Sequence, residues 1–131
     1  MSVYFDTNVL VYAFSVGQKG EIAWQLLARG GATGVQNLTE FANVARKKLK
    51  MDWSEVRSSI DRIATLATIS EPIDLQLHGQ GLLISQRYQL GVFDSMIVAA
   101  ALRFGCTTLW TEDLHDGLVV QDVLTIRNPF A

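Results

Sequence analysis

"VYFDTNVLVYAF", residues 3–14, places one acid, Asp6, inside a run of sequence that is otherwise almost wholly apolar. Because the segment SVYF at 2–5 has the composition of a short buried strand, the acid follows a strand directly. A carboxylate buried without a partner costs several kcal/mol, roughly the effective penalty for desolvating one ion. We therefore expect another part of the fold, or a bound cation, to compensate the charge of Asp6.

The composition predicts a single domain over residues 1–131. With 49% hydrophobic residues in a chain of 131, there is ample material for one core, and no repeat or linker interrupts it. The longest apolar runs, such as MIVAAAL at 96–102, are too short to cross a bilayer, and no signal peptide with a basic start precedes Val3. We expect a soluble, cytoplasmic protein with no membrane association.

Charge and cysteine content argue against two function classes. A formal net charge of -2 does not suit a protein that coats nucleic acid by bulk charge, although a local patch can still grip a polyanionic substrate. The single cysteine, Cys106, has no partner for an internal disulfide or a thiolate metal site. We expect it to be packed in the core and expect no redox chemistry.

Short apolar segments alternate with helical patterns along the chain. Strands are expected at 2–5, 33–36, 67–70, 107–111 and 123–126, and helices at about 20–29, from Asn37 or Thr39 to about 49, at 52–67, 74–90 and 94–105. Asp52 and Asp74 are expected to cap their helices, with Glu55 completing a capping box. The alternation implies parallel strand pairing and an α/β layered domain.

Four acids far apart in the sequence fall at the ends of these elements. Asp6 follows the first strand, Glu40 opens the helix after the second, Asp94 opens the helix before TTLWT, and Asp113 lies two residues beyond that strand. The carboxyl ends of parallel strands share one edge of a sheet, so these carboxylates are expected to converge there. Their repulsion requires bound cations or shared protons, and their hard oxygens favour Mg²⁺ or Mn²⁺ over Zn²⁺.

Each acid also has an interpretation that involves no catalysis. Taken singly, Asp94 is a partner of its helix dipole, Glu40 an ordinary first-turn acid and Asp113 an ordinary loop acid. Asp116, in the same loop, is either a fifth member of the cluster or a turn residue. The joint placement favours a site, because unrelated caps have no reason to gather at one sheet edge.

Four segments resemble the motif regions of the PIN-domain ribonucleases, and most closely those of the VapC-like toxins of bacterial type II toxin–antitoxin pairs. They are FDTNVLVYA at 5–13, LTEFANVARKKL at 38–49, LGVFDSMIVAAAL at 90–102 and LWTEDLHDG at 109–117. The segments stand in the family's order and span nearly the whole chain, up to the closing NPF at 128–130. The resemblance implies a three-layer α/β/α fold with a short, mainly parallel central sheet.

The same resemblance implies roles for individual residues. The catalytic acids, which would also be the ligands of one or two Mg²⁺ or Mn²⁺ ions, are Asp6, Glu40, Asp94 and Asp113. The supporting residues beside them would be Asn8, Ser95 and Thr111, with Asp116 as a further candidate. The implied activity is endoribonuclease cleavage of an RNA substrate, a reaction in which metal ions activate water and stabilise charge on the phosphate. The implied partners are a cognate antitoxin and a second copy of the chain in a homodimer.

The remaining polar and aromatic signals are ambiguous. RKKLK at 46–50 either contacts RNA phosphates or complements a helix dipole, and we favour the second role for at least half of its cations. The tryptophans Trp24, Trp53 and Trp110 are expected to pack rather than to stack on bases. His78 and His115 are given no role.

Other function classes stay open. A response-regulator receiver has a similar size and also gathers acids around Mg²⁺, but it needs a lysine after a late strand, where the nearest cation is Arg127. A haloacid-dehalogenase-like phosphatase needs an aspartate where Asn8 stands. A non-catalytic PIN-like module that binds RNA or protein is disfavoured because all four acids are present.

Overall fold

The computed structural model describes residues 2–131, which form six strands and six helices. In chain order these are β1 (Val3–Phe5), α1 (Thr7–Ala13), α2 (Gln18–Ala28), β2 (Ala32–Thr33), α3 (Val35–Lys47), α4 (Trp53–Leu66), β3 (Thr68–Ile69), α5 (Leu75–Tyr88), α6 (Val92–Arg103), β4 (Thr108–Trp110), β5 (Val119–Val120) and β6 (Leu124–Arg127).

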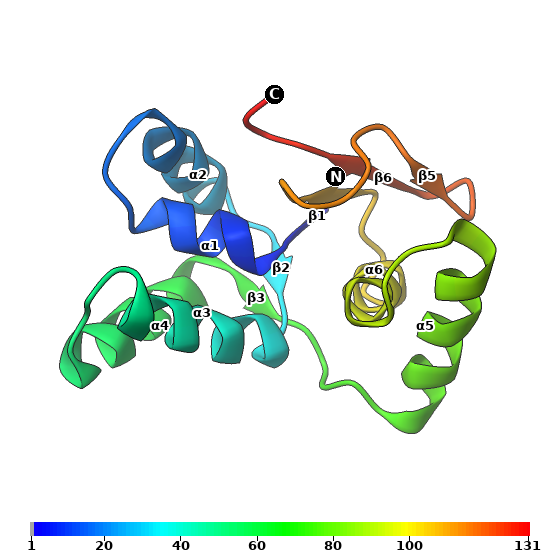
Figure 1. The fold of residues 1–131 in the computed structure, drawn as a ribbon, viewed down its shortest axis with the longest axis horizontal. Coiled ribbons are helices and arrows are strands. Elements are labelled where there is room, and N and C mark those ends of the chain that lie inside the picture. The colour runs from blue at the N-terminus through cyan, green and yellow to red at the C-terminus, as the bar shows by residue number, and fades with distance from the viewer. Residues whose placement is uncertain (1) are drawn as a thin grey trace.

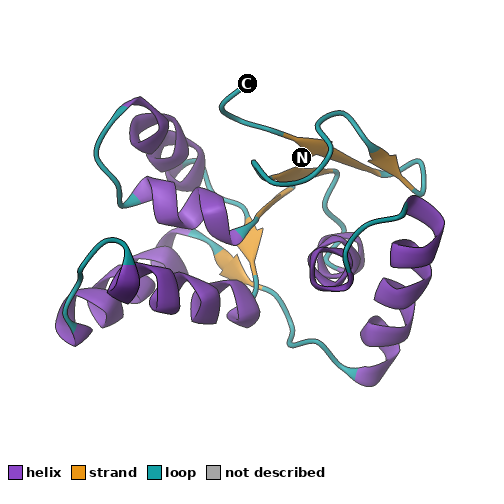
Figure 2. Ribbon diagram, viewed as in Figure 1, coloured by secondary structure: helices purple, strands orange, loops and turns teal. Residues whose placement is uncertain are grey.

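The strands form one twisted sheet in the order β3-β2-β1-β4-β6-β5. Every neighbouring pair is parallel except β5 and β6, which are antiparallel. The helices α1 to α4 lie on one side of the sheet, and α5 and α6 lie on the other (Figure 1, Figure 2). The predicted three-layer α/β/α fold with a mainly parallel sheet is therefore confirmed.

The central strand β1 is buried on both faces, which explains its continuous apolar sequence. Tyr4 faces the core that α5 and α6 cover, where it packs with Val98 and Leu109 among others. Phe5 faces the opposite core, formed with α1 to α4, and packs there with residues such as Leu10. The two cores fix β1 in the middle of the sheet, and thereby fix where the chain leaves it.

The pairing of β1 with β4 places two segments of the sequence side by side. Phe5 is in register with Trp110, and the backbone N–H of Asp6 donates to the Trp110 carbonyl at 3.0 Å. Asp6 and Thr111 are consequently the first residues beyond these neighbouring strands at the same edge. This is the edge at which open α/β sheets bind their ligands.

The stretch 3–14 divides at Asp6 into a strand and the helix α1, whereas the sequence patterns predicted only the strand. Asp6 is the N-cap of this helix, and its side chain accepts a hydrogen bond from the Thr7 N–H. Helix α1 has seven residues, four of them buried, so its sequence is too short and too apolar to display a helical period.

The strand predicted at 33–36 is wrong after its first residue, because β2 is Ala32–Thr33 and α3 begins at Val35. The N-cap is Gly34, whose N–H donates to Oδ1 of Asn37 at 3.2 Å. Asn37 and Thr39 therefore lie inside the helix instead of capping it.

The other helix starts agree with the sequence more closely. Asp52 accepts from the Glu55 N–H, and Asp74 from the Leu77 N–H, each at 2.8 Å, as expected for N-caps. Helix α6 begins at Val92 with Gly91 as its N-cap, so Asp94 lies within the first turn and does not itself cap the helix. The two-residue strand β5 was not predicted.

The expectation that Cys106 is packed in the core is also met. Cys106 is a free thiol that is fully buried in the core, and burial raises its pKa. Within residues 2–131 there is no helix with both the length and the apolarity needed to cross a bilayer.

Candidate active site

The Asp6 carboxylate is buried, with 5% of the residue exposed, and hydrogen bonds compensate both of its oxygens. Oδ1 accepts from the Thr7 backbone N–H and Oδ2 from the Thr111 hydroxyl, each at 2.7 Å. The side-chain amides of Asn8 and Asn37 approach the same carboxylate at 3.4 Å. Hydrogen-bond donors from α1, α3 and the loop after β4 thus compensate part of the negative charge of Asp6.

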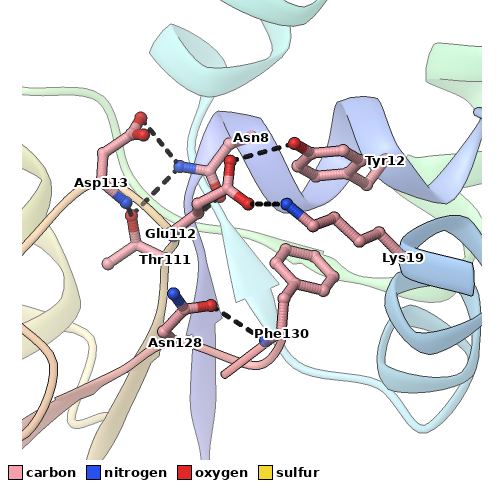
Figure 3. A network of polar contacts seen from close by, with 8 residues as sticks. All are labelled: Asn8, Tyr12, Lys19, Thr111, Glu112, Asp113, Asn128 and Phe130. Carbon is pink, nitrogen blue, oxygen red and sulfur yellow. Dashed lines mark hydrogen bonds and ion pairs between the residues drawn. The ribbon is translucent and has the colours of Figure 1, made fainter.

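Asn8 links Asp6 to a second acid, Asp113, and Figure 3 shows its contact with Asp113. Its Nδ2 donates to Oδ2 of Asp113 at 3.0 Å and to the Thr111 hydroxyl at 3.1 Å. Its Oδ1 accepts from the Glu112 backbone N–H at 3.1 Å. One amide from α1 therefore holds three consecutive residues of the loop after β4, and it brings Asp113 to the edge where Asp6 lies.

Glu40 and Asp94 lie close enough to Asp6 for their charges to interact with it. Burial raises the pKa of Asp6, hydrogen bonds oppose the rise, and the charges of Asp113 and Asp94 add to it. Partial burial of its carboxyl raises the pKa of Glu40, although the residue is exposed overall, and Asp6 and Asp94 raise it further. The pKa of Asp94 is raised by burial and by Asp113. These four residues, Asp6, Glu40, Asp94 and Asp113, are called the acid site below.

The ligand atoms that the acid site offers suit a hard cation. All are carboxylate oxygens, which Mg²⁺ and Mn²⁺ prefer. Burial is the main cause of the raised pKa values of Asp6, Glu40 and Asp94, and neighbouring acids add a repulsion that a cation would relieve. Within residues 2–131, however, no three side chains among Asp, Glu, His and Cys are spaced to hold one metal ion together. Mg²⁺ in proteins usually keeps several waters and binds to one or two carboxylates. The acid site fits that kind of binding better than a site in which every ligand is a protein atom.

Two of the predicted supporting residues use their polar atoms elsewhere. Ser95 is fully buried, and its hydroxyl donates to the Gly91 carbonyl at 2.8 Å within α6. The exposed Asp116 accepts from the Asn128 N–H at 2.8 Å, so it ties its loop to the segment after β6. Within residues 2–131 neither side chain is hydrogen-bonded to one of the four acids, so the supporting role of Ser95 and the choice between the two roles of Asp116 stay predictions.

Sequence reasoning missed two residues next to the acids. Asn37 is 1% exposed, and besides Asp6 its Nδ2 reaches the Thr7 hydroxyl at 3.1 Å. Its only sequence signal was a polar residue at the edge of a motif region, which was interpreted as a cap. Glu112 stands between Thr111 and Asp113 and pairs with Lys19 at 2.8 Å, a contact that no spacing in the sequence indicates.

The basic segment 46–50 is partly structural. The Arg46 guanidinium stacks over the Trp53 ring at 4.5 Å from its centroid and donates to the Met51 carbonyl at 3.0 Å. Trp53 is 59% exposed and so lies outside the core, where packing at an interface stays a prediction. Trp24 and Trp110 pack against the core that contains Phe5, as expected. In the described chain none of the remaining cations of this segment pairs with an acid; they are Lys47, Lys48 and Lys50.

Comparison with solved structures shows which proteins share this fold. A toxin–antitoxin complex from Klebsiella pneumoniae has a chain that superposes with a TM-score of 0.74 at 22% identity, over 98% of each chain. VapBC-1 from nontypeable Haemophilus influenzae gives 0.71 at 15% identity over 100% of each chain. VapC20 from Mycobacterium tuberculosis, a sarcin-ricin loop cleaving toxin, gives 0.66 at 16% identity over 82% of this chain and 87% of that one.

Comparison by sequence identifies the family. None of the curated proteins matches the chain. The sequence pattern of the PIN domain, in contrast, matches residues 3–115, which hold the acid site and all but the last part of the sheet. The protein therefore belongs to the PIN domain family.

Proposed function

We propose that this protein is a metal-dependent endoribonuclease and the toxin component of a type II toxin–antitoxin pair. The observation that carries the proposal is the hydrogen-bond network that joins Asp6 to Asp113, with Glu40 and Asp94 close enough to interact by charge. PIN domain proteins are typically nucleases, and an array of carboxylates at a sheet edge suits that chemistry.

A bound Mg²⁺ or Mn²⁺ ion, or a pair of them, would supply an activated water and charge stabilisation at the attacked phosphate. The chain's own residues prepare the ligands. Thr7 and Thr111 each bind one oxygen of Asp6 and so fix the plane of its carboxylate, while Asn8 orients Asp113. Such orienting contacts keep the remaining lone pairs directed at the opening between the acids.

The proposed substrate is RNA, and the proposed partners are a cognate antitoxin and a second copy of the chain, in the cytoplasm. Support comes from the shared fold, because one neighbour is described as a toxin that cleaves the sarcin-ricin loop and others are toxin–antitoxin complexes. The acid site is also a suitable docking point for an arginine of an inhibitor, whose planar guanidinium binds two carboxylate oxygens at once.

The nuclease proposal is tested by incubating the purified protein with structured RNAs, with and without Mg²⁺ or Mn²⁺. Cleavage should require the metal and should fall by orders of magnitude in Asp6→Asn and in Asp94→Asn. Equal cleavage by wild type and both variants would mean that the activity is a contaminant or that its site lies elsewhere. RNA binding without cleavage would favour the non-catalytic PIN-like module.

The toxin proposal has its own test. Expression of the chain alone should arrest growth, and a small protein encoded beside it should restore growth. If arginine-to-alanine changes across the partner's contacting segment leave inhibition intact, docking of an arginine in the acid site is wrong. The receiver-like alternative loses its support, since the chain belongs to the PIN domain family.

A further inference from the structure

Four side chains form a polar and aromatic cluster beside the acid site, between α1, α2 and the loop after β4 (Figure 3). The Glu112 carboxylate accepts from the Tyr12 hydroxyl at 3.0 Å and from the Lys19 ammonium at 2.8 Å. Lys19 Nζ lies 5.1 Å from the centroid of the Tyr12 ring and 5.5 Å from that of Phe130, and these rings meet edge to face. We name this cluster, made of Tyr12, Lys19, Glu112 and Phe130, the Glu112 clamp.

The backbone of residues 111–113 connects the clamp to the acid site. Glu112 is the residue between Thr111, which binds Asp6, and the acid Asp113. Its N–H donates to Oδ1 of Asn8, whose Nδ2 binds Asp113. The Glu112 side chain points toward Tyr12 and away from the Asp113 carboxylate (Figure 3). Movement of Glu112 would therefore displace its neighbours on both sides without any contact between its own carboxylate and the acids.

The last residue of β6 and the segment after it hold the same loop at two further points. The Thr111 N–H donates to the Arg127 carbonyl at 3.0 Å, and the Asn128 N–H donates to Asp116 at 2.8 Å. Oδ1 of Asn128 accepts from the Phe130 N–H at 2.9 Å, which fixes the backbone that carries the Phe130 ring of the clamp. The loop is thus held at Thr111, Glu112 and Asp116, on either side of the exposed Asp113.

We infer that Glu112 is a positioning residue for the acid site, and that Lys19 and Tyr12 act through it. The inference rests on the proposed function, because positioning of the acids has a measurable consequence only if they bind a cation. An ion pair whose side chains are 50% and 27% exposed contributes little to folding stability. Its effect is instead geometric, since groups that orient metal ligands change metal affinity or activity by about 10- to 100-fold.

Charge alone and positioning predict opposite effects for Lys19→Met. Removal of a cation beside the acids makes the local potential more negative, which by itself tightens binding of Mn²⁺. Loss of the ammonium donor to Glu112 loosens the loop that carries Asp113, which weakens binding of Mn²⁺. The methionine side chain keeps an apolar contact with the rings of Tyr12 and Phe130, so the substitution removes mainly the charged donor.

The test is a titration of the full chain with Mn²⁺ alone, with free Mn²⁺ followed by electron paramagnetic resonance. Lys19→Met should raise the Kd for Mn²⁺ by about tenfold, and should lower kcat for RNA cleavage with little change in KM. Arg103→Gln is the matched control, because Arg103 forms a similarly exposed pair with Asp74 at 3.0 Å beside the linker to α5. This control should bind Mn²⁺ as wild type does.

The outcomes separate the inference from the proposed function. If wild type binds Mn²⁺ and Lys19→Met binds it equally or more tightly, the positioning role is wrong and the proposed function stands. If wild type does not bind Mn²⁺, the proposed function fails and the positioning role fails with it.

A second pair of variants keeps the charge change constant. Glu112→Gln and Glu112→Ala remove the same negative charge, but the glutamine retains an acceptor for Tyr12 or Lys19. Glu112→Gln should therefore bind Mn²⁺ several-fold more tightly than Glu112→Ala, with both variants shown to be folded by thermal melting. Equal affinities in the two variants would overturn the inference.

Discussion

Thr111 and Asp6 stand 105 positions apart in the sequence, yet the hydroxyl of one donates a 2.7 Å hydrogen bond to the carboxylate of the other. Both residues are buried at the ends of neighbouring parallel strands, β4 and β1. The same bond therefore secures the register of the central sheet and the orientation of the most buried acid.

Thr111→Val removes this donor at nearly constant volume and leaves a buried carboxylate oxygen short of a partner. Hydrogen bonds to charged groups contribute about 1.5 to 3 kcal/mol, so the free energy of unfolding should fall by about 2 kcal/mol. Urea denaturation at neutral pH in EDTA measures the loss. Thr111→Ser retains the donor and should lose less than half as much. If Thr111→Val is as stable as wild type, or is less destabilised than Thr111→Ser, packing of the methyl group and not the hydrogen bond stabilises the fold at this position.

Asp94→Asn should leave the melting temperature of the metal-free protein unchanged or raise it. The asparagine has nearly the same shape and removes one of the charges that raise the pKa values of Asp6 and Glu40. In EDTA the variant should melt at or above wild type, whereas added Mg²⁺ should stabilise wild type more, because a ligand that binds only the native state adds stability. A variant clearly less stable in EDTA, with wild type indifferent to Mg²⁺, would contradict a clustered site.

The metal-free protein should gain stability as the pH falls through the raised carboxyl pKa values. The folded-state pKa values of Asp6, Glu40 and Asp94 lie above the ordinary 3.8 and 4.5, so in that interval the folded protein binds more protons than the unfolded chain. The gain starts near the raised values and is complete below the ordinary ones. Urea denaturation in EDTA at successive pH values from neutrality to about 4 measures it, and Asp6→Asn should flatten the profile.

Glu112 contributes to the pH dependence of stability with the opposite sign. The hydrogen bond from Lys19 holds the pKa of its carboxyl below the ordinary 4.5, so this contribution is lost only as the pH falls through that lowered value. The two effects therefore occupy different intervals, with the gain at higher pH. A steady loss of stability from neutrality downward in EDTA would show that folding does not raise the pKa values of Asp6, Glu40 and Asp94.

Asn37→Asp should destabilise the metal-free protein more than Asn37→Ala does. The alanine variant loses the buried hydrogen bonds to Thr7 and Asp6, a cost of about 1 to 3 kcal/mol, whereas the aspartate adds a carboxylate that faces Asp6 across the former 3.4 Å contact. Because a cation relieves this repulsion, Mg²⁺ should narrow the difference between the two variants in thermal melts. An order that is reversed in EDTA would mean that Asn37 does not face the Asp6 charge in solution.

The positions of Asp6 and Asp113 were predictable because each follows a strand, whereas Glu40 was expected to open its helix and instead lies in the second turn of α3. A short apolar strand ends at Asp6, and Asp52 with Glu55 marks a helix start by a capping box that needs no tertiary information. The edge at which Asp6 and Asp113 meet then follows from parallel pairing alone, because that pairing puts the carboxyl ends of β1 and β4 together.

The supporting contacts were not predictable, because they depend on how the elements dock. Asn37 is a preferred N-cap type, but Gly34 takes that position, and the asparagine instead reaches across to Thr7. Ser95 lies beside a catalytic candidate in sequence, yet a buried hydroxyl in a helix can equally bond to the carbonyl four residues earlier, as it does here. Local sequence does not distinguish these choices.

The sheet ends in very short strands on both sides, since β3 and β5 have two residues each. An edge of that length presents too few free backbone groups for another chain to add a strand to it. The proposed second copy or inhibitory protein is therefore expected to recognise side chains, such as those of the acid site, and not to extend the sheet by a strand.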